Sequence, residues 1–174
     1  MADFRLLPGE RLLWSGQPGQ GIVLSPQDAF LIPFSLLWGG FAIFWNVGVW
    51  TGHAPVFFRL WGLPFLAAGL YFIVGRFVHD AWLRSRTDYA VTDRRAIIAR
   101  GGNVRSLDLA SLPLLDMEER SDGSGTIWFG SRETMFGHRG WGMWIPSTGS
   151  TPRFAGLSNV RATYELITRR AGAD

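Results

Sequence analysis

The chain has 174 residues, a length typical of one domain, and a formal net charge of +3. All 17 basic side chains are arginines, and the absence of cysteine excludes disulfides, thiolate metal sites and cysteine nucleophiles. The charges are unevenly distributed, because residues 29–78 contain only Arg59 and Arg76. This pattern argues against a purely soluble globule and indicates a membrane anchor joined to a small soluble domain.

Residues 1–25 are expected to form a cytoplasmic N-terminal segment, and residues 29–50 are the first predicted membrane span. The span carries no charge, and its 22 residues reach about 33 Å as a helix, enough to cross a bilayer. The sequence Ser25-Pro26-Gln27-Asp28 before it has the residue types of a helix start. Asn46 is strongly polar and is expected to bond to another helix.

Residues 60–75 are the second predicted span, although 16 uncharged residues are few for a crossing. Arg59 and Arg76 at its ends can extend toward the membrane surface, so that residues 57–58 and 77–78 also lie in the apolar layer. The alternative is a buried helical hairpin in a soluble protein. Neither run has a polar stripe at helical spacing, which favours a two-span hairpin over residues 26–86.

The arginines also predict the orientation of this hairpin. The linker at residues 51–58 contains no arginine, whereas several arginines precede the first span and follow the second. By the positive-inside rule both termini are expected in the cytoplasm, and two spans return the chain to the side from which it started.

Residues 87–174 show short apolar runs between turn signals, followed by a helical pattern. The predicted strands are residues 88–92, 96–100, 104–108, 114–120 and 126–130, with two further candidates at 141–145 and 152–155 and a long loop at 131–142. Strands at this spacing predict a sandwich or barrel. Leu157, Val160, Tyr164 and Ile167 share one face of a C-terminal helix, for which Ser158 is the expected N-cap.

Four segments resemble the bacterial pleckstrin-homology-like family. They are residues 10–18 (ERLLWSGQP), 89–98 (YAVTDRRAII), 123–127 (GSGTI) and 154–157 (FAGL). The resemblance covers nearly the whole chain, and in membrane-bound members a segment like 10–18 comes just ahead of two spans. It implies a small barrel of about seven strands capped by one C-terminal helix, in a protein of the bacterial inner membrane. The Gly- and Trp-rich stretch 132–144 is longer than the family pattern.

The sequence offers little support for catalysis. His53, His79 and His138 are scattered and give no metal-ligand spacing, so neither a metal nor a cofactor is expected. The acidic cluster Asp116, Glu118 and Glu119 is interpreted as a solvated face, because a strand points the third side chain away from the other two. Nucleic-acid binding would rest on net charge alone, without a reading element, and is not expected.

Arg94, Arg95, Arg100 and Arg105 are the candidate contacts for the membrane surface or for a partner. They are predicted on two adjacent strands and their turn, with the Arg94–Arg95 turn facing the inner leaflet and its anionic headgroups. The alternative is a set of solvated or ion-paired arginines. The expected function is non-catalytic: the domain binds or scaffolds a protein partner, or a second copy, at the membrane. A second hypothesis is an assembly factor for a membrane complex that acts through its spans, as the resemblance implies for some family members.

Overall fold

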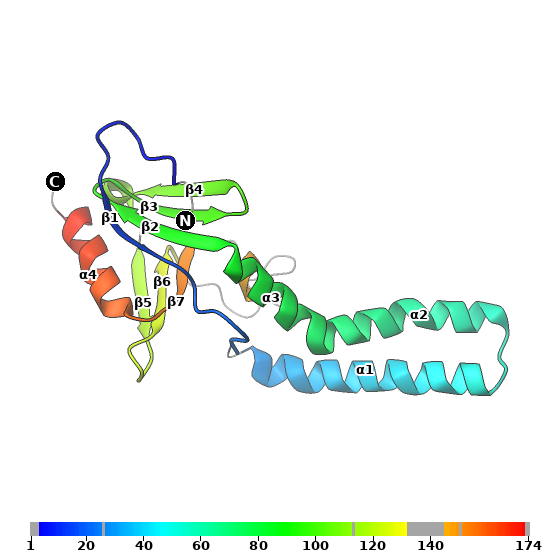
Figure 1. Cartoon of the computed structure of the whole chain (residues 1–174). Helices are drawn as coiled ribbons and strands as arrows, with labels where there is room; N and C mark the ends of the chain where they lie inside the picture. Colours follow the sequence, from blue (N-terminus) through cyan, green and yellow to red (C-terminus); the bar gives the residue numbers. More distant parts are fainter. Residues whose placement is uncertain (1–3, 26, 113, 132–144, 150, 173–174) are drawn as a thin grey trace.

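The computed structural model describes residues 4–25, 27–112, 114–131, 145–149 and 151–172. It consists of a β domain from which a long helical hairpin projects (Figure 1). Both ends of the described chain lie in the β domain, at the same end of the hairpin.

The hairpin is built from two helices that are long and apolar enough to cross a membrane. The first is α1 (Asp28–Thr51). The second is α2 (Val56–Leu70), which continues through a π-helical turn at Tyr71–Gly75 into α3 (Arg76–Ser85). The two predicted apolar helices are therefore confirmed. The second helix extends beyond its apolar stretch, because the amphipathic α3 continues it toward the β domain.

Close packing of α1 on α2 depends on glycine and on one polar contact. The position that a Cβ would take on Gly69 lies 3.0 Å from the Cα of Gly39, so the two helices meet there nearly backbone to backbone. Farther along, the Asn46 side-chain amide donates to the carbonyls of Ala42 and Gly62, at 2.8 and 3.0 Å. The prediction that Asn46 bonds to another helix is confirmed.

At the start of α1, Ser25 and Asp28 bond to each other, with the acid as the acceptor. The Asp28 carboxylate accepts hydrogen bonds from the Ser25 backbone N–H at 2.6 Å and from the Ser25 hydroxyl at 2.9 Å. The acid thus reaches back over the first turn, as the acid of a capping box does.

The β domain contains two antiparallel sheets, with strand orders β1-β2-β3-β4 and β5-β6-β7. The first sheet comprises β1 (Leu12–Gly16), β2 (Thr87–Thr92), β3 (Arg95–Arg100) and β4 (Asn103–Asp108). The second comprises β5 (Leu115–Glu119), β6 (Gly125–Phe129) and β7 (Arg153–Leu157). Six of these strands were predicted to within two or three residues. Of the candidate strand at 141–145, only Ile145 lies within the described residues, and it is not in a strand.

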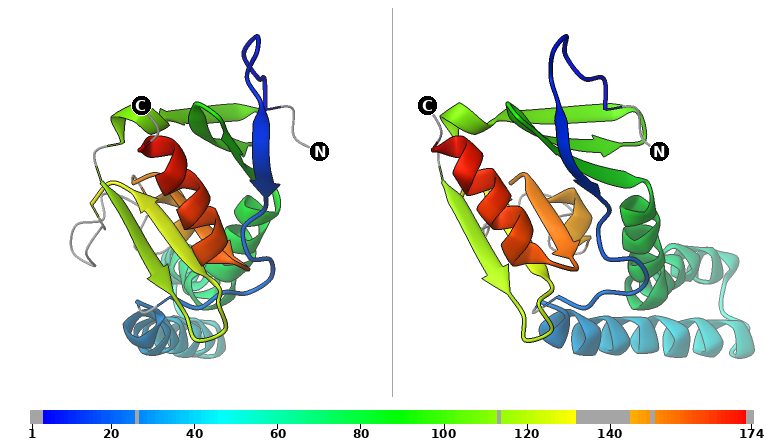
Figure 2. Two further views of the ribbon diagram at one scale, coloured as in Figure 1. Left: turned by 90° about the vertical axis from the view of Figure 1, so that its left-hand side faces the viewer. Right: turned by 60° about the vertical axis from the view of Figure 1, so that its left-hand side comes forward.

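The expectation of a closed barrel is wrong for the part of the chain that the structure describes. No described strand of one sheet pairs with a strand of the other, and a barrel needs an unbroken ladder around its circumference. The sheets instead enclose a core in which Phe154 packs against Tyr89 at 4.5 Å and against Phe129 at 4.9 Å between ring centroids. The last helix, α4 (Val160–Ala171), lies along this core beside β5 and β6 (Figure 2). Its N-cap is Asn159, which accepts from the Ala162 N–H at 3.1 Å, and not the expected Ser158.

The position of β1 was not predicted. This strand comes from the N-terminal segment and pairs with β2, so the whole hairpin is inserted between two neighbouring strands of one sheet. The apolar run of β1 is too short to stand out before its partner is known. Its Trp14 stacks on Phe154 at 5.9 Å and so adds to the core. The chain therefore leaves the domain and returns to it at adjacent points of the same sheet.

Candidate functional site

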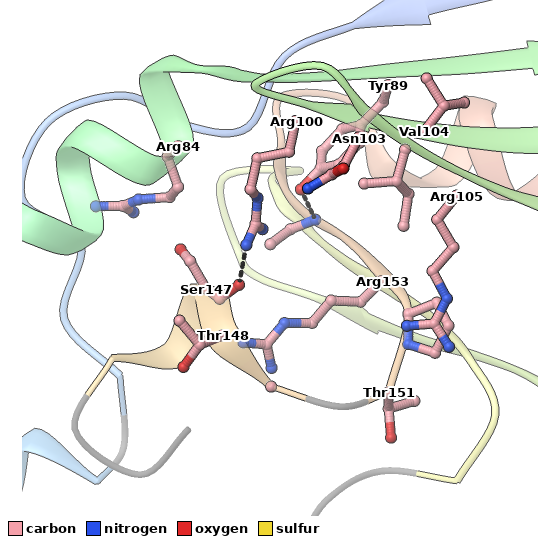
Figure 3. Close-up of a pocket in the computed structure, with 14 residues that line it drawn as sticks. Arg84, Tyr89, Arg100, Asn103, Val104, Arg105, Ser147, Thr148, Thr151 and Arg153 are labelled. Atoms are coloured by element: carbon pink, nitrogen blue, oxygen red, sulfur yellow. Dashed lines mark hydrogen bonds between the residues drawn. The ribbon is translucent and has the colours of Figure 1, made fainter. Parts of the chain in front are cut away.

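A pocket of about 250 Å³ lies where the helical hairpin joins the β domain (Figure 3). Its walls come from the end of α3, the adjoining ends of β3 and β4, the 3-10 turn Pro146–Thr148 and the start of β7. Elements from both sheets and from the second helix thus meet around one cavity.

Arginine dominates the lining of this pocket, which we call the arginine pocket. Among the described residues the lining contains Arg84 from α3, Arg100 from β3, Arg105 from β4 and Arg153 from β7, and it contains no aspartate or glutamate. Neutral polar groups come from Asn103, Ser147, Thr148 and Thr151. A recess lined by charges of one sign focuses the electrostatic potential, so this pocket favours anions.

Two of the arginines are held by bonds to the surrounding chain. The Arg100 guanidinium donates to the Thr87 hydroxyl at 3.0 Å and to the Ser147 carbonyl at 2.7 Å. Arg84 donates to the Gly21 carbonyl at 2.6 Å and pairs with Asp80, one helical turn earlier, at 3.2 Å. Arg105 and Arg153 interact with neighbouring residues as well. The guanidinium groups of Arg84 and Arg100 are therefore held in place by the protein itself.

Tyr89 forms part of the pocket wall and reports the local electrostatics. Its hydroxyl accepts a hydrogen bond from the Ala155 N–H at 3.1 Å. Burial raises the pKa of Tyr89, while the Ala155 bond and the positive charges of Arg100, Arg153 and Arg84 act in the opposite direction. The phenol is neutral at physiological pH, and its oxygen lies in a positive potential.

The structure divides the four arginines chosen from the sequence into two pairs. Arg100 and Arg105 line the pocket, and Arg100 sits opposite Thr87, directly after the second helix. Arg94 and Arg95 follow β2 at its other end, so their turn points away from the hairpin (Figure 1). The turn with Arg94 and Arg95 is therefore at the end of the sheet opposite the hairpin, and Arg100 is at the end next to the hairpin.

Arg84 and Arg153 were not singled out from the sequence. Arg84 follows the second apolar run, where several arginines flank the helix, and Arg153 is a single arginine within the candidate strand at 152–155. They meet Arg100 only because the two sheets and α3 converge, and no local pattern reveals such a convergence.

Arg95 has a structural partner at the far end of the sheet. Its guanidinium bonds to the Glu10 carboxylate at 2.7 and 2.9 Å, and the Thr92 hydroxyl donates to the same carboxylate at 2.7 Å. These bonds, chiefly those from Arg95, lower the pKa of Glu10 from 4.5 to about 2. The cluster joins the N-terminal segment to the β2–β3 turn.

The described ranges contain no group of three His, Asp or Glu side chains placed to hold a metal ion. Of the acidic cluster on β5, Glu119 pairs with Arg161 of α4 at 2.6 Å. Both side chains of this pair are partly exposed.

The fold and the pocket define a class of protein: a two-sheet β domain with an apolar helical hairpin inserted into one sheet and a basic cavity at the junction. Comparisons with protein-family models, with curated proteins and with solved structures gave no match.

Proposed function

We propose that this chain is a two-span protein of the bacterial inner membrane that holds a non-catalytic binding domain at the cytoplasmic surface. The apolar side chains of the hairpin support the membrane assignment, because large ones such as Leu37 and Phe44 are about three-quarters exposed, at 76% and 75%. A contiguous apolar surface of this kind is unusual on a soluble monomer and is typical of contact with lipid or protein.

The observation that carries the proposal is the stiff junction between hairpin and domain. A single residue, Arg86, separates α3 from β2. At the base of the hairpin Arg76 pairs with Asp28 at 2.6 Å, and Asp80 accepts the Ser147 N–H at 2.9 Å. The pair joins α1 to the second helix, and the bonds of Asp80 and of Arg84, which donates to the Gly21 carbonyl, hold the second helix to the domain. Such a junction presents one face of the domain to the membrane and a constant face to a partner, as a scaffold requires.

The arrangement of four and three strands followed by a C-terminal helix supports a pleckstrin-homology-like assignment for the domain. We propose that its partner is a protein, or a second copy, that contacts β4. This strand is at the edge of its sheet among the described strands, and residues 103–106 are all exposed. An exposed edge strand offers unpaired backbone groups to an incoming strand.

The second candidate function is an assembly factor that acts through the helices. A specific feature favours it: a groove of about 240 Å³ between α1 and α2 that is almost entirely apolar and aromatic. The groove is lined by Trp38, Phe41, Ala42, Trp45, Trp61 and Phe65. A helix of another membrane protein would find there a concave surface without polar groups.

The proposed topology makes a direct prediction, because the chain has no natural cysteine. Gly52→Cys, in the linker between the helices, is expected to react with a membrane-impermeant maleimide in spheroplasts. Ser106→Cys, on exposed β4, is expected to react only after the membrane is permeabilised. Labelling of the Ser106→Cys variant in intact spheroplasts would show that the β domain lies on the outer side of the membrane, opposite to the proposed orientation.

The two functions can be separated by site-specific photocrosslinking in native membranes. A photoreactive residue replaces Val104 on the β4 edge, Phe41 in the aromatic groove or, as a control, exposed Arg161 on α4. Under the scaffold proposal the Val104 variant forms a defined protein adduct and the Arg161 variant does not. Adducts at Phe41 alone would support the assembly factor, and the same adducts at all three sites would contradict both.

A further inference from the structure

We propose that the arginine pocket binds a phosphate monoester dianion, carried by a lipid headgroup or free in the cytosol. The proposal deepens the function above, since it names the ligand of the domain and depends on the pocket lying at the membrane surface. The juxtaposition that carries it is the convergence of Arg84, Arg100, Arg105 and Arg153 from four different elements.

The charge of the pocket selects the class of ligand. Guanidinium groups match the geometry of phosphate oxygens and bind them with two parallel hydrogen bonds. Each guanidinium has five N–H donors, so an arginine that already bonds to the protein can also bind an anion. The described lining contributes four arginines and no carboxylate, while Asp80, outside the lining, pairs with Arg84 at 3.2 Å. A dianion would therefore meet more arginine than acid at the wall.

The pocket is also shaped in advance. The bonds from Arg100 to Thr87 and Ser147 hold its guanidinium at the wall, which reduces the conformational entropy lost on binding. The cavity volume of about 250 Å³ is several times the roughly 30 Å³ occupied by a water molecule. A phosphate group fits with room for part of a glycerol or sugar.

The position of the pocket makes both sources of phosphate accessible. The Asp28–Arg76 pair marks the base of the apolar hairpin. Arg84 lies eight residues beyond Arg76 on the same helix, about 12 Å at the usual helical rise. The headgroup layer on each side of a bilayer is about 5–8 Å thick. Arg84 thus lies about 4–7 Å beyond this layer, within reach of a projecting headgroup and of the cytosol.

Equilibrium binding to the full chain in zwitterionic detergent tests the proposal. The probes are inorganic phosphate, dihexanoyl phosphatidic acid and dihexanoyl phosphatidylcholine, with sodium chloride at equal ionic strength as the reference. We expect phosphatidic acid or inorganic phosphate to bind and to raise the melting temperature beyond the effect of chloride. Phosphatidylcholine, whose phosphate is a diester beside a cation, should have no such effect.

Comparing the affinities for phosphatidic acid and for inorganic phosphate distinguishes a lipid headgroup from free phosphate as the ligand. Phosphatidic acid that binds about tenfold or more tightly than inorganic phosphate would assign the site to a lipid headgroup. Equal affinities would assign it to free phosphate. If neither exceeds chloride, the proposal is overturned.

Variants separate a ligand site from arginines that only hold the domain together. Arg105→Gln changes an exposed side chain and is expected to weaken phosphate binding about tenfold or more, as the loss of a charge-assisted contact should. Arg100→Gln should weaken phosphate binding as well. If the Arg100→Gln variant fails to fold, Arg105→Gln alone still tests the proposal. Arg94→Gln, exposed at the far end of the sheet, is the matched control and should bind like the wild type.

Unchanged affinity in Arg105→Gln and in folded Arg100→Gln would overturn the proposal. That result would leave the topology and crosslinks of the proposed function unaffected, so the two can fail separately.

Discussion

Asp28→Asn is expected to lower the free energy of unfolding of the full chain by about 3–5 kcal/mol, the usual cost of breaking a buried ion pair. The side chains of Arg76 and Asp28 are only 2% and 5% exposed, and the pair joins the two helices at their base. Arg76 also donates to the Phe72 carbonyl at 3.0 Å, and its guanidinium lies over the Phe77 ring. The neutral amide would leave this buried guanidinium without its counter-charge, and that desolvated charge is the source of the loss.

The measurement is denaturant-induced unfolding in mixed micelles, followed by circular dichroism. The double variant Asp28→Leu with Arg76→Met should recover most of the stability, because removing both charges also removes the desolvation cost. Glu165→Gln is the control: its pair with Arg169 is exposed, with 3.4 Å between the charged atoms, and should change stability by less than about 1 kcal/mol. A loss below about 1 kcal/mol in Asp28→Asn would show that the pair does not stabilise the base of the hairpin.

Glu10→Gln is expected to destabilise the β domain by about 2–3 kcal/mol at neutral pH and to change its response to acid. The Glu10 carboxylate is buried and bonds to Arg95 and Thr92, which lowers its pKa from 4.5 to about 2 in the folded chain. A carboxyl whose pKa is lowered by folding stabilises the native state when it is ionised. Its contribution is complete above about pH 4.5 and is lost as the pH falls from there toward about 2.

The test compares unfolding free energies of wild type and Glu10→Gln between about pH 7 and about pH 2.5. Other carboxylates also titrate in this range, so the informative quantity is the difference between the two proteins. That difference should be largest above about pH 5 and should shrink steadily below about pH 4.5. Glu165→Gln, which removes an exposed carboxylate, should show a small difference throughout. A constant difference for Glu10→Gln would mean that its pKa is not lowered in the folded chain.

Half of the arginine pocket could be predicted from the sequence. Arg100 and Arg105 were chosen because they lie close to the end of the second helix and to each other, which is a local property. Arg94 and Arg95 met the same criterion, yet a six-residue strand carries them to the opposite end of the sheet. Arg84 and Arg153 are far apart in the chain and come together only because α3 packs against the turn Pro146–Thr148, which precedes β7.

Local sequence was sufficient to predict the two apolar helices, six of the seven described strands and the C-terminal helix. These features follow from hydrophobic periodicity, turn residues and charge distribution, all of which act over a few neighbouring positions. Three other features emerged with the tertiary structure: β1 pairs with β2 across the inserted hairpin, the described strands form two sheets without closing a barrel, and arginines from four elements surround one cavity. They depend on contacts between distant segments, where burial of the shared core and pairing of backbone groups select one arrangement among many that satisfy the same local pattern.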